Sequence, residues 1–85
     1  MIACDLHDYV EIACIYKMLL ILRLKSGDII QGVALDTARN ELAEECIKVR
    51  QGTVDSLVVL DSIMTMEAKK KNPHFDLVNF CSKSF

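Results

Sequence analysis

Hydrophobic and polar positions change their spacing near residue 18, which divides the chain into a helical start and a strand-rich remainder. Before that point, apolar residues recur at the three- and four-residue steps that place side chains on one face of a helix. Those apolar positions are Leu6, Tyr9, Val10 and Ala13. Asp5 precedes most of them and has the residue type that caps a first helical turn. We therefore expect an N-terminal helix over about residues 5–16.

The other side of this helix carries Asp5, Asp8 and Glu11, which are three residues apart, and no Lys or Arg. The two aspartates could simply cap the helix and complement its dipole, but Glu11 lies beyond the first turn. Ile12 and Ile15 fall among the acids, where a purely solvated face would not need them. They either pack under the C-terminal strand or contact a partner.

From residue 18 the apolar positions alternate, which predicts short strands. The expected strands cover 18–25, 28–36, 45–50, 56–60 and 63–66, with a last edge strand within 75–80. Gly27 provides a hairpin turn, and Gly32 inside its strand marks a bend or a close backbone approach. The polar stretch 37–44 predicts a loop or a short helical turn, and Met64 and Met66 predict core packing.

One helix followed by five or six strands indicates a mainly β protein, folded as a strongly bent antiparallel barrel or sandwich. We expect a single domain over 1–85, with a β body over about 18–67 and a C-terminal edge segment over 74–80. A chain of 85 residues has no room for a second core.

Composition narrows the function classes. With a net charge of −2, the chain lacks the overall excess of basic residues that is typical of nucleic-acid-binding proteins. We therefore expect no direct binding of nucleic acid. No apolar run spans a bilayer and no export signal opens the chain, so a cytoplasmic protein that does not contact membranes is expected. The run Lys69 to Lys71 is typical of a solvated flank.

Catalytic and metal chemistry find little support. The four cysteines are scattered without metal-ligand spacing, so we expect reduced thiols, no metal and no cofactor. His7 lies beside Asp8, but no nucleophile or second acid pattern accompanies the pair. A surface histidine is the simpler interpretation, and the chain is not expected to be an enzyme.

The segment LRLKSGDIIQGVALD, residues 22–36, resembles the first Sm motif in its hairpin glycine, its bend glycine and its terminal acid. Asn40 follows Asp36 at the offset of the asparagine with which Sm-like RNA binders read a base. The second Sm motif would carry an Arg-Gly pair, where this chain has LDSI at residues 60–63. The resemblance implies an Sm-like fold without the stacking arginine.

A second resemblance covers nearly the whole chain. The opening IACD at residues 2–5, the helix DYVEIAC at 8–14, the hairpin LKSG at 24–27 and LDSI at 60–63 are similar to the Rof (YaeO) family of Rho-binding antiterminators. The resemblance implies a protein that binds the RNA-loading site in the N-terminal OB-fold region of the transcription terminator Rho and inhibits termination. It assigns the contacts mainly to the acidic helix, with help from the loop after the second strand.

Carried over to this chain, the contacting residues are Asp5, Asp8 and Glu11, together with Asp36, Arg39 and Asn40. Three acids along two helical turns span roughly 9 Å. Their carboxylates could therefore imitate the phosphates of one or two nucleotides and no longer stretch of RNA. Ile12 and Ile15 could supply a desolvated centre. We expect a monomer when the protein is free; the alternative is an Sm/Hfq-like RNA-binding ring, which a mass measurement would reveal.

Overall fold

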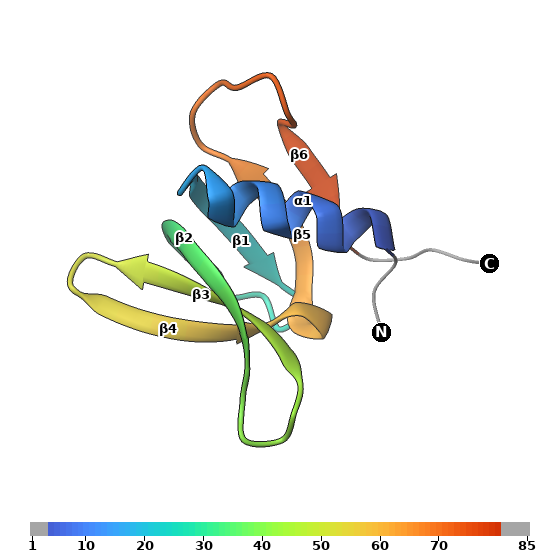
Figure 1. The fold of residues 1–85 in the computed structure, drawn as a ribbon, viewed down its shortest axis with the longest axis vertical. Coiled ribbons are helices and arrows are strands. Elements are labelled where there is room, and N and C mark those ends of the chain that lie inside the picture. The colour runs from blue at the N-terminus through green and yellow to red at the C-terminus, as the bar shows by residue number, and fades with distance from the viewer. Residues whose placement is uncertain (1–3, 81–85) are drawn as a thin grey trace.

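The computed structural model describes residues 4–80, with side chains described from residue 7 onward. The described residues start with one helix, α1 (Cys4–Ile15), and continue as strands (Figure 1). These are β1 (Leu19–Leu24), β2 (Ile29–Arg39), β3 (Glu45–Gln51), β4 (Val54–Val59), β5 (Ile63–Ala68) and β6 (Leu77–Asn79). A short 3₁₀ turn, η1 (Leu60–Ser62), joins β4 to β5.

The six strands form one antiparallel sheet in the order β4-β3-β2-β1-β5-β6. The sheet bends strongly but does not close, so β4 and β6 remain its edges. Helix α1 lies across the sheet and packs against β2 (Figure 1). The sequence predicted one N-terminal helix and a strongly bent, Sm-like antiparallel barrel or sandwich of five or six strands. This fold class is confirmed, with six strands in one sheet that is bent but not closed.

The end of α1 directs the chain straight into β1. The Met18 N–H donates to the Ala13 carbonyl at 2.9 Å, and the Lys17 N–H donates to the Cys14 carbonyl at 3.2 Å. Lys17 itself has a φ of 49°, the left-handed conformation that ends many helices. This paired hydrogen-bond pattern satisfies the last carbonyl groups of α1 and fixes the angle between helix and sheet.

The core lies between α1 and the bent sheet. The apolar helix face predicted from the sequence is buried at Val10 and Ala13, and Tyr9 packs against the core from the same face. The side chain of Leu6, predicted for that face, lies outside the described residues. The sheet contributes the fully buried Leu20, Leu22, Ala34, Ile47, Val49, Ile63 and Met66. Burying this apolar surface is the main force that holds the helix in place.

A close approach of two strands explains the glycine in the middle of β2. A Cβ at Gly32 would lie 2.5 Å from the Arg50 carbonyl oxygen and 2.5 Å from Val49 Cγ1. Real Cβ atoms do not approach backbone this closely, so only glycine fits here. Two residues later, the pairing with β3 shifts register between Ala34 and Asp36. The glycine and the bulge together let β2 bend.

Three expectations about local structure were wrong. β2 continues through Thr37 and Ala38 to Arg39, so the loop is limited to residues 40–44. Helix α1 already includes Cys4, which places Asp5 inside the first turn and not at the capping position. Met64 is 38% exposed, because the register between β1 and β5 shifts there and the shift turns its side chain outward.

Candidate functional site

A groove of about 310 Å³ separates the N-terminal half of α1 from the far end of the β2–β3 hairpin. It is lined by His7, Glu11, Thr37, Ala38, Arg39, Glu45, Cys46 and Leu60. Glu11 of the helix and Arg39 at the end of β2 were both predicted from the sequence as site residues, and the fold brings them to the same groove.

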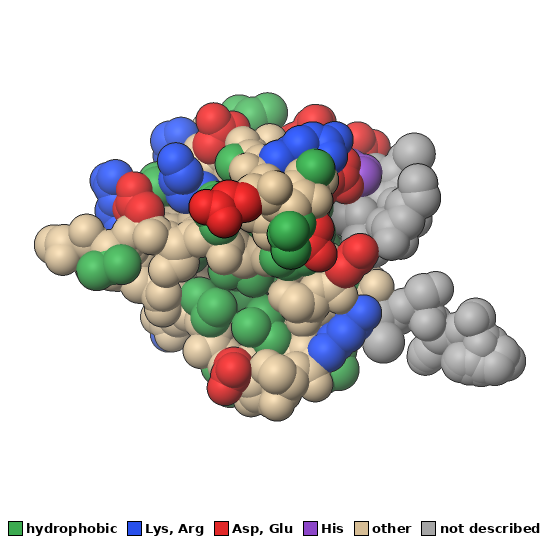
Figure 2. Space-filling view, turned by 90° about the horizontal axis from the view of Figure 1, so that it is seen from below, with side chains coloured by type: hydrophobic (Ala, Val, Ile, Leu, Met, Phe, Trp, Pro, Cys, Tyr) green, Lys and Arg blue, Asp and Glu red, His purple; other side chains and the backbone are tan. Residues whose placement is uncertain are grey.

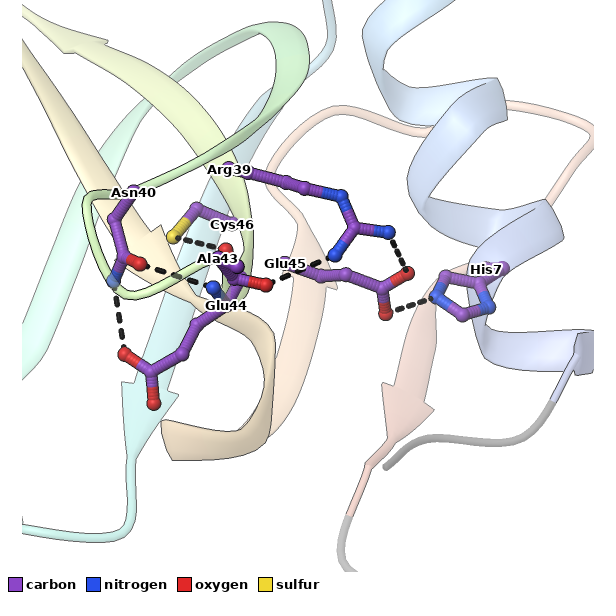
Figure 3. Close-up of polar contacts among 7 residues, drawn as sticks. All are labelled: His7, Arg39, Asn40, Ala43, Glu44, Glu45 and Cys46. Atoms are coloured by element: carbon purple, nitrogen blue, oxygen red, sulfur yellow. Dashed lines mark hydrogen bonds and ion pairs between the residues drawn. The ribbon is translucent and has the colours of Figure 1, made fainter.

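A polar contact crosses the groove. Nε2 of His7 lies 2.8 Å from Oε1 of Glu45, and Oε2 of the same carboxylate lies 3.7 Å from Nη2 of Arg39 (Figure 3). Arg39 and Glu45 are directly opposite each other in the β2–β3 register. Glu45 therefore links the helix to the hairpin across the groove.

Sequence reasoning treated His7 as an ordinary surface histidine and did not nominate Glu45 at all. The signal that could have found Glu45 is the hairpin register, which pairs it with Arg39 once β2 is extended to that residue. No local pattern could have found its contact with His7, which depends on how the helix packs on the sheet.

Asn40 builds the β2–β3 loop. Its Oδ1 accepts a hydrogen bond from the backbone N–H of Glu44 at 3.0 Å, and its Nδ2 donates to Glu44 Oε1 at 2.9 Å (Figure 3). The same Oδ1 also accepts a 2.9 Å hydrogen bond from the backbone N–H of Leu42. Arg39 Nη1 adds a 2.9 Å hydrogen bond to the Ala43 carbonyl. The amide of Asn40 thus holds the loop in shape, and in this conformation it is occupied by the chain's own groups.

Two acidic side chains of the helix, Asp8 and Glu11, have no partner among residues 7–80. Asp8 and Glu11 are exposed, and neither carboxylate makes a hydrogen bond or an ion pair within residues 7–80. Asp36 is also exposed, and its Oδ1 accepts a 2.8 Å hydrogen bond from the Thr37 N–H. The side chain of Asp5 lies outside the described residues. Unpaired exposed carboxylates are free to meet a cationic surface.

The pKa of the buried Cys14 thiol is affected by the nearby carboxylates. Its pKa is raised from 9.0 to about 11, chiefly by burial, with further contributions from the charges of Asp36 and Glu11, while Lys17 acts in the opposite direction. Both carboxylates therefore lie near one point beneath the helix surface. The thiol itself is free, buried and protonated at neutral pH.

The two isoleucines among the acids have different surroundings. Ile12 is half-buried and packs against the core, whereas the side chain of Ile15 is 70% exposed.

Figure 2 shows one face of the molecule on which basic and acidic groups are interspersed and apolar side chains gather near the centre. That face therefore carries charges of both signs and no large area of a single sign.

Among the side chains of residues 7–80 there is no cluster of three or more His, Cys, Asp or Glu that could hold a metal ion. Residues 4–80 contain no helix with the length and hydropathy needed to cross a bilayer.

An acidic helix packed on an open, bent six-stranded sheet, with a polar groove between them, defines a helix-capped Sm-like β protein. A family model described as modulator of Rho-dependent transcription termination (ROF) matches residues 1–80 of this sequence. The chain belongs to this family, whose members regulate Rho-dependent termination.

One solved structure gives an independent comparison. The chain is similar to YaeO bound to magnesium from Vibrio cholerae O395, with 39% sequence identity and a TM-score of 0.84. The match covers 87% of this chain and 96% of that chain. No curated protein matches this sequence. The predicted family resemblance is confirmed by the family model and by this structure.

Proposed function

We propose that this protein inhibits Rho-dependent termination by covering the RNA-loading site in the N-terminal OB-fold region of Rho. The contacting surface, called here the acidic face, consists of Asp5, Asp8 and Glu11 of α1 with Asp36, Arg39 and Asn40 of the β2–β3 hairpin. The observation that carries the proposal is the pair of exposed carboxylates, Asp8 and Glu11, which have no partner within residues 7–80. The family assignment supplies Rho as the partner.

The chemistry of an RNA-loading site favours such a face. Such a site must be basic, because phosphate contacts supply most of the affinity for RNA. Carboxylates three residues apart on a helix have Cβ atoms about 5–6 Å apart, so Asp8 and Glu11 can meet neighbouring cationic side chains. Each charge-assisted contact would contribute on the order of 1.5–3 kcal/mol, and less where it stays exposed. Bound in this way, the protein excludes RNA by occupying the same cations.

Charge alone would steer the encounter more than hold the complex. Ile15, with 70% of its side chain exposed, is the apolar residue next to the acids that can be desolvated on binding. Ile12 can contribute only the part of its side chain that the core leaves uncovered. We infer that the isoleucines slow dissociation while the acids accelerate association.

Contacts at the groove hold the helix part and the hairpin part of the acidic face in a defined arrangement. His7 and Glu45 join α1 to the start of β3, and Asn40 holds the loop through its own backbone contacts. A surface already in its binding conformation loses little conformational entropy on association. The role of Asn40 in this proposal is to position Arg39 and the loop.

The decisive experiment reverses the charge of the helix. Asp8→Lys combined with Glu11→Lys should lower the affinity for Rho at least tenfold and abolish displacement of RNA from Rho, measured by fluorescence anisotropy of labelled RNA. The matched control is Asp28→Lys with Asp76→Lys, two exposed acids that do not line the groove. Equal loss in both variants, or unchanged affinity in the helix variant with its fold intact, would contradict the acidic-face mechanism.

Salt provides a second test of the same proposal. If carboxylates meet Rho cations, the association rate should fall steeply as ionic strength rises, while the dissociation rate changes less. Stopped-flow measurements of both rates would separate these contributions. An association rate independent of salt would indicate an apolar interface instead.

A further inference from the structure

A second, larger groove lies at the opposite end of α1, outside the acidic face. Its volume is about 570 Å³, and it runs between the C-terminal end of the helix and the loop that precedes β6. Three lysines line it, Lys17, Lys70 and Lys71, and no Asp or Glu is among its lining residues. In a chain with a net charge of −2, this groove is a local site of positive charge.

An aromatic platform forms one wall of this groove. The rings of Tyr16 and His74 are stacked, with centroids 4.7 Å apart and planes inclined by 23°. Tyr16 keeps 59% of its surface exposed although the histidine covers part of it. An exposed aromatic ring and three lysines therefore line the same groove.

The loop that carries His74 is held in place by Asn72. Oδ1 of Asn72 accepts hydrogen bonds from the backbone N–H groups of His74 at 2.7 Å and Phe75 at 3.1 Å, and Nδ2 donates to the Phe75 carbonyl at 3.0 Å. Phe75 is buried in the core against Tyr9, with ring centroids 5.6 Å apart. The platform is thus anchored to the core and not formed by a chance contact of two surface rings.

We propose that this groove binds a nucleotide, with the base stacked on Tyr16 and the phosphate between the ammonium groups of Lys70 and Lys71. The ammonium groups of both lysines have no hydrogen bond or ion pair within residues 7–80, whereas Lys17 already donates to the Leu35 carbonyl at 3.1 Å. A flat aromatic ring beside positive charge is the combination that holds single-stranded nucleic acid, because every base can stack and every phosphate is anionic.

The site goes beyond the proposed function, and none of its lining residues belongs to the acidic face. Tyr16 follows Glu11 by five residues, which corresponds to about 7.5 Å along a helix axis, and it is next to Ile15 in the sequence, so the two proposed surfaces are neighbours. Composition had predicted no direct contact with nucleic acid, and that expectation considered the net charge of the whole chain and not a local groove. The nucleotide could be free or part of a strand, and these two sources share the same base-and-phosphate chemistry.

The test uses the full-length free protein without Rho, so its outcome is independent of the acidic face. Fluorescence anisotropy would measure binding of a labelled oligoadenylate of about six nucleotides at low salt, with AMP as a competitor. Tyr16→Ala should weaken binding about tenfold, and Tyr16→Phe should retain it, because the phenyl ring still stacks. Competition by AMP would identify a free nucleotide as a sufficient ligand; binding of the oligonucleotide without such competition would identify a strand.

The lysines need a control of identical net charge. Lys70→Glu with Lys71→Glu should abolish binding, whereas Lys25→Glu with Lys69→Glu, which lie outside the lining of the groove, should retain most of it. Circular dichroism would check that each variant folds. Equal loss in the two double variants would show diffuse attraction and overturn the site, as would unchanged binding by Tyr16→Ala or no binding of either probe at about 1 mM.

Discussion

His7 on α1 and Glu45 at the start of β3 are joined by a 2.8 Å contact between Nε2 and Oε1, although 38 residues separate them in the sequence. The same carboxylate reaches toward Arg39 on the opposite strand (Figure 3). The contact links the helix that carries the acids to the hairpin that carries the loop. Because the two side chains are 35% and 43% exposed, we expect the bond to position the helix more than to stabilise the fold.

The first prediction measures this coupling. In a double-mutant cycle of His7→Gln and Glu45→Gln, urea unfolding should give an interaction free energy of about 0.5–1 kcal/mol. Affinity for Rho should fall in either single variant, because the helix is less well fixed relative to the loop. Additive effects on unfolding in the cycle would mean that the contact contributes nothing in solution.

The second prediction concerns the close approach at Gly32. Gly32→Ala should lower the free energy of unfolding by about 1–3 kcal/mol, because the added Cβ would lie 2.5 Å from the Arg50 carbonyl oxygen. Gly52→Ala is the control: its φ of +66° makes alanine strained, but nothing lies within 4 Å of the added atom. Chemical denaturation of both variants should find Gly32→Ala the less stable of the two.

Local sequence pattern predicted those parts of the fold that depend on local periodicity. Val10 and Ala13 share a helix face and both are buried, and Ile47 and Val49 alternate on one face of β3 and are buried too. The position of Gly32 inside an apolar strand also indicated a close approach correctly. In each case the residue's own neighbours along the chain carried the information.

Features that depend on a partner strand or on helix packing could not be predicted from local periodicity. Thr37 and Arg39 are polar and exposed, so nothing local marks them as strand; their pairing with Ile47 and Glu45 does. Met64 faces outward because of a register shift against β1, which its own strand does not encode. The place of Glu45 in the site follows only from its contact with His7, which forms when the helix packs on the sheet.

The third prediction uses the left-handed residue in the β2–β3 loop. Ala43 has a φ of 62°, a conformation that alanine adopts at a cost of about 1–2 kcal/mol and glycine without that cost. After allowance for the greater freedom of glycine in the unfolded chain, Ala43→Gly should raise the unfolding free energy by about 0.5–1 kcal/mol. Ala38→Gly, in the regular part of β2, should lower it instead, and thermal melts would compare the two.

The fourth prediction concerns assembly. We expect the free protein to sediment as a monomer of 9.6 kDa. A ring of Sm type would have to pair one sheet edge with the other, and here β6 offers only the three residues Leu77–Asn79. On the other edge, Asp55 of β4 is paired with Arg50 of β3 at 2.8 Å, and such charges discourage edge pairing. A stable hexamer or heptamer in sedimentation equilibrium would favour the RNA-binding ring instead.

The fifth prediction follows from the buried thiol beneath the acidic helix. Burial raises the pKa of Cys14 from 9.0 to about 11, so between these values the folded protein keeps a proton that the unfolded chain releases. Stability should therefore fall as pH rises through this window, by on the order of 1 kcal/mol per pH unit from this group. Below pH 9 the thiol is protonated in both states and contributes no slope.

Cys14→Ala isolates this effect from the other groups that titrate in alkali. The difference in unfolding free energy between the two proteins, measured by urea denaturation under reducing conditions, should be constant below pH 9. Above it, the wild type should lose stability faster than the variant until the folded thiol also ionises near pH 11. Parallel curves across the whole range would show that the thiol is not buried as the packing of α1 on β2 requires.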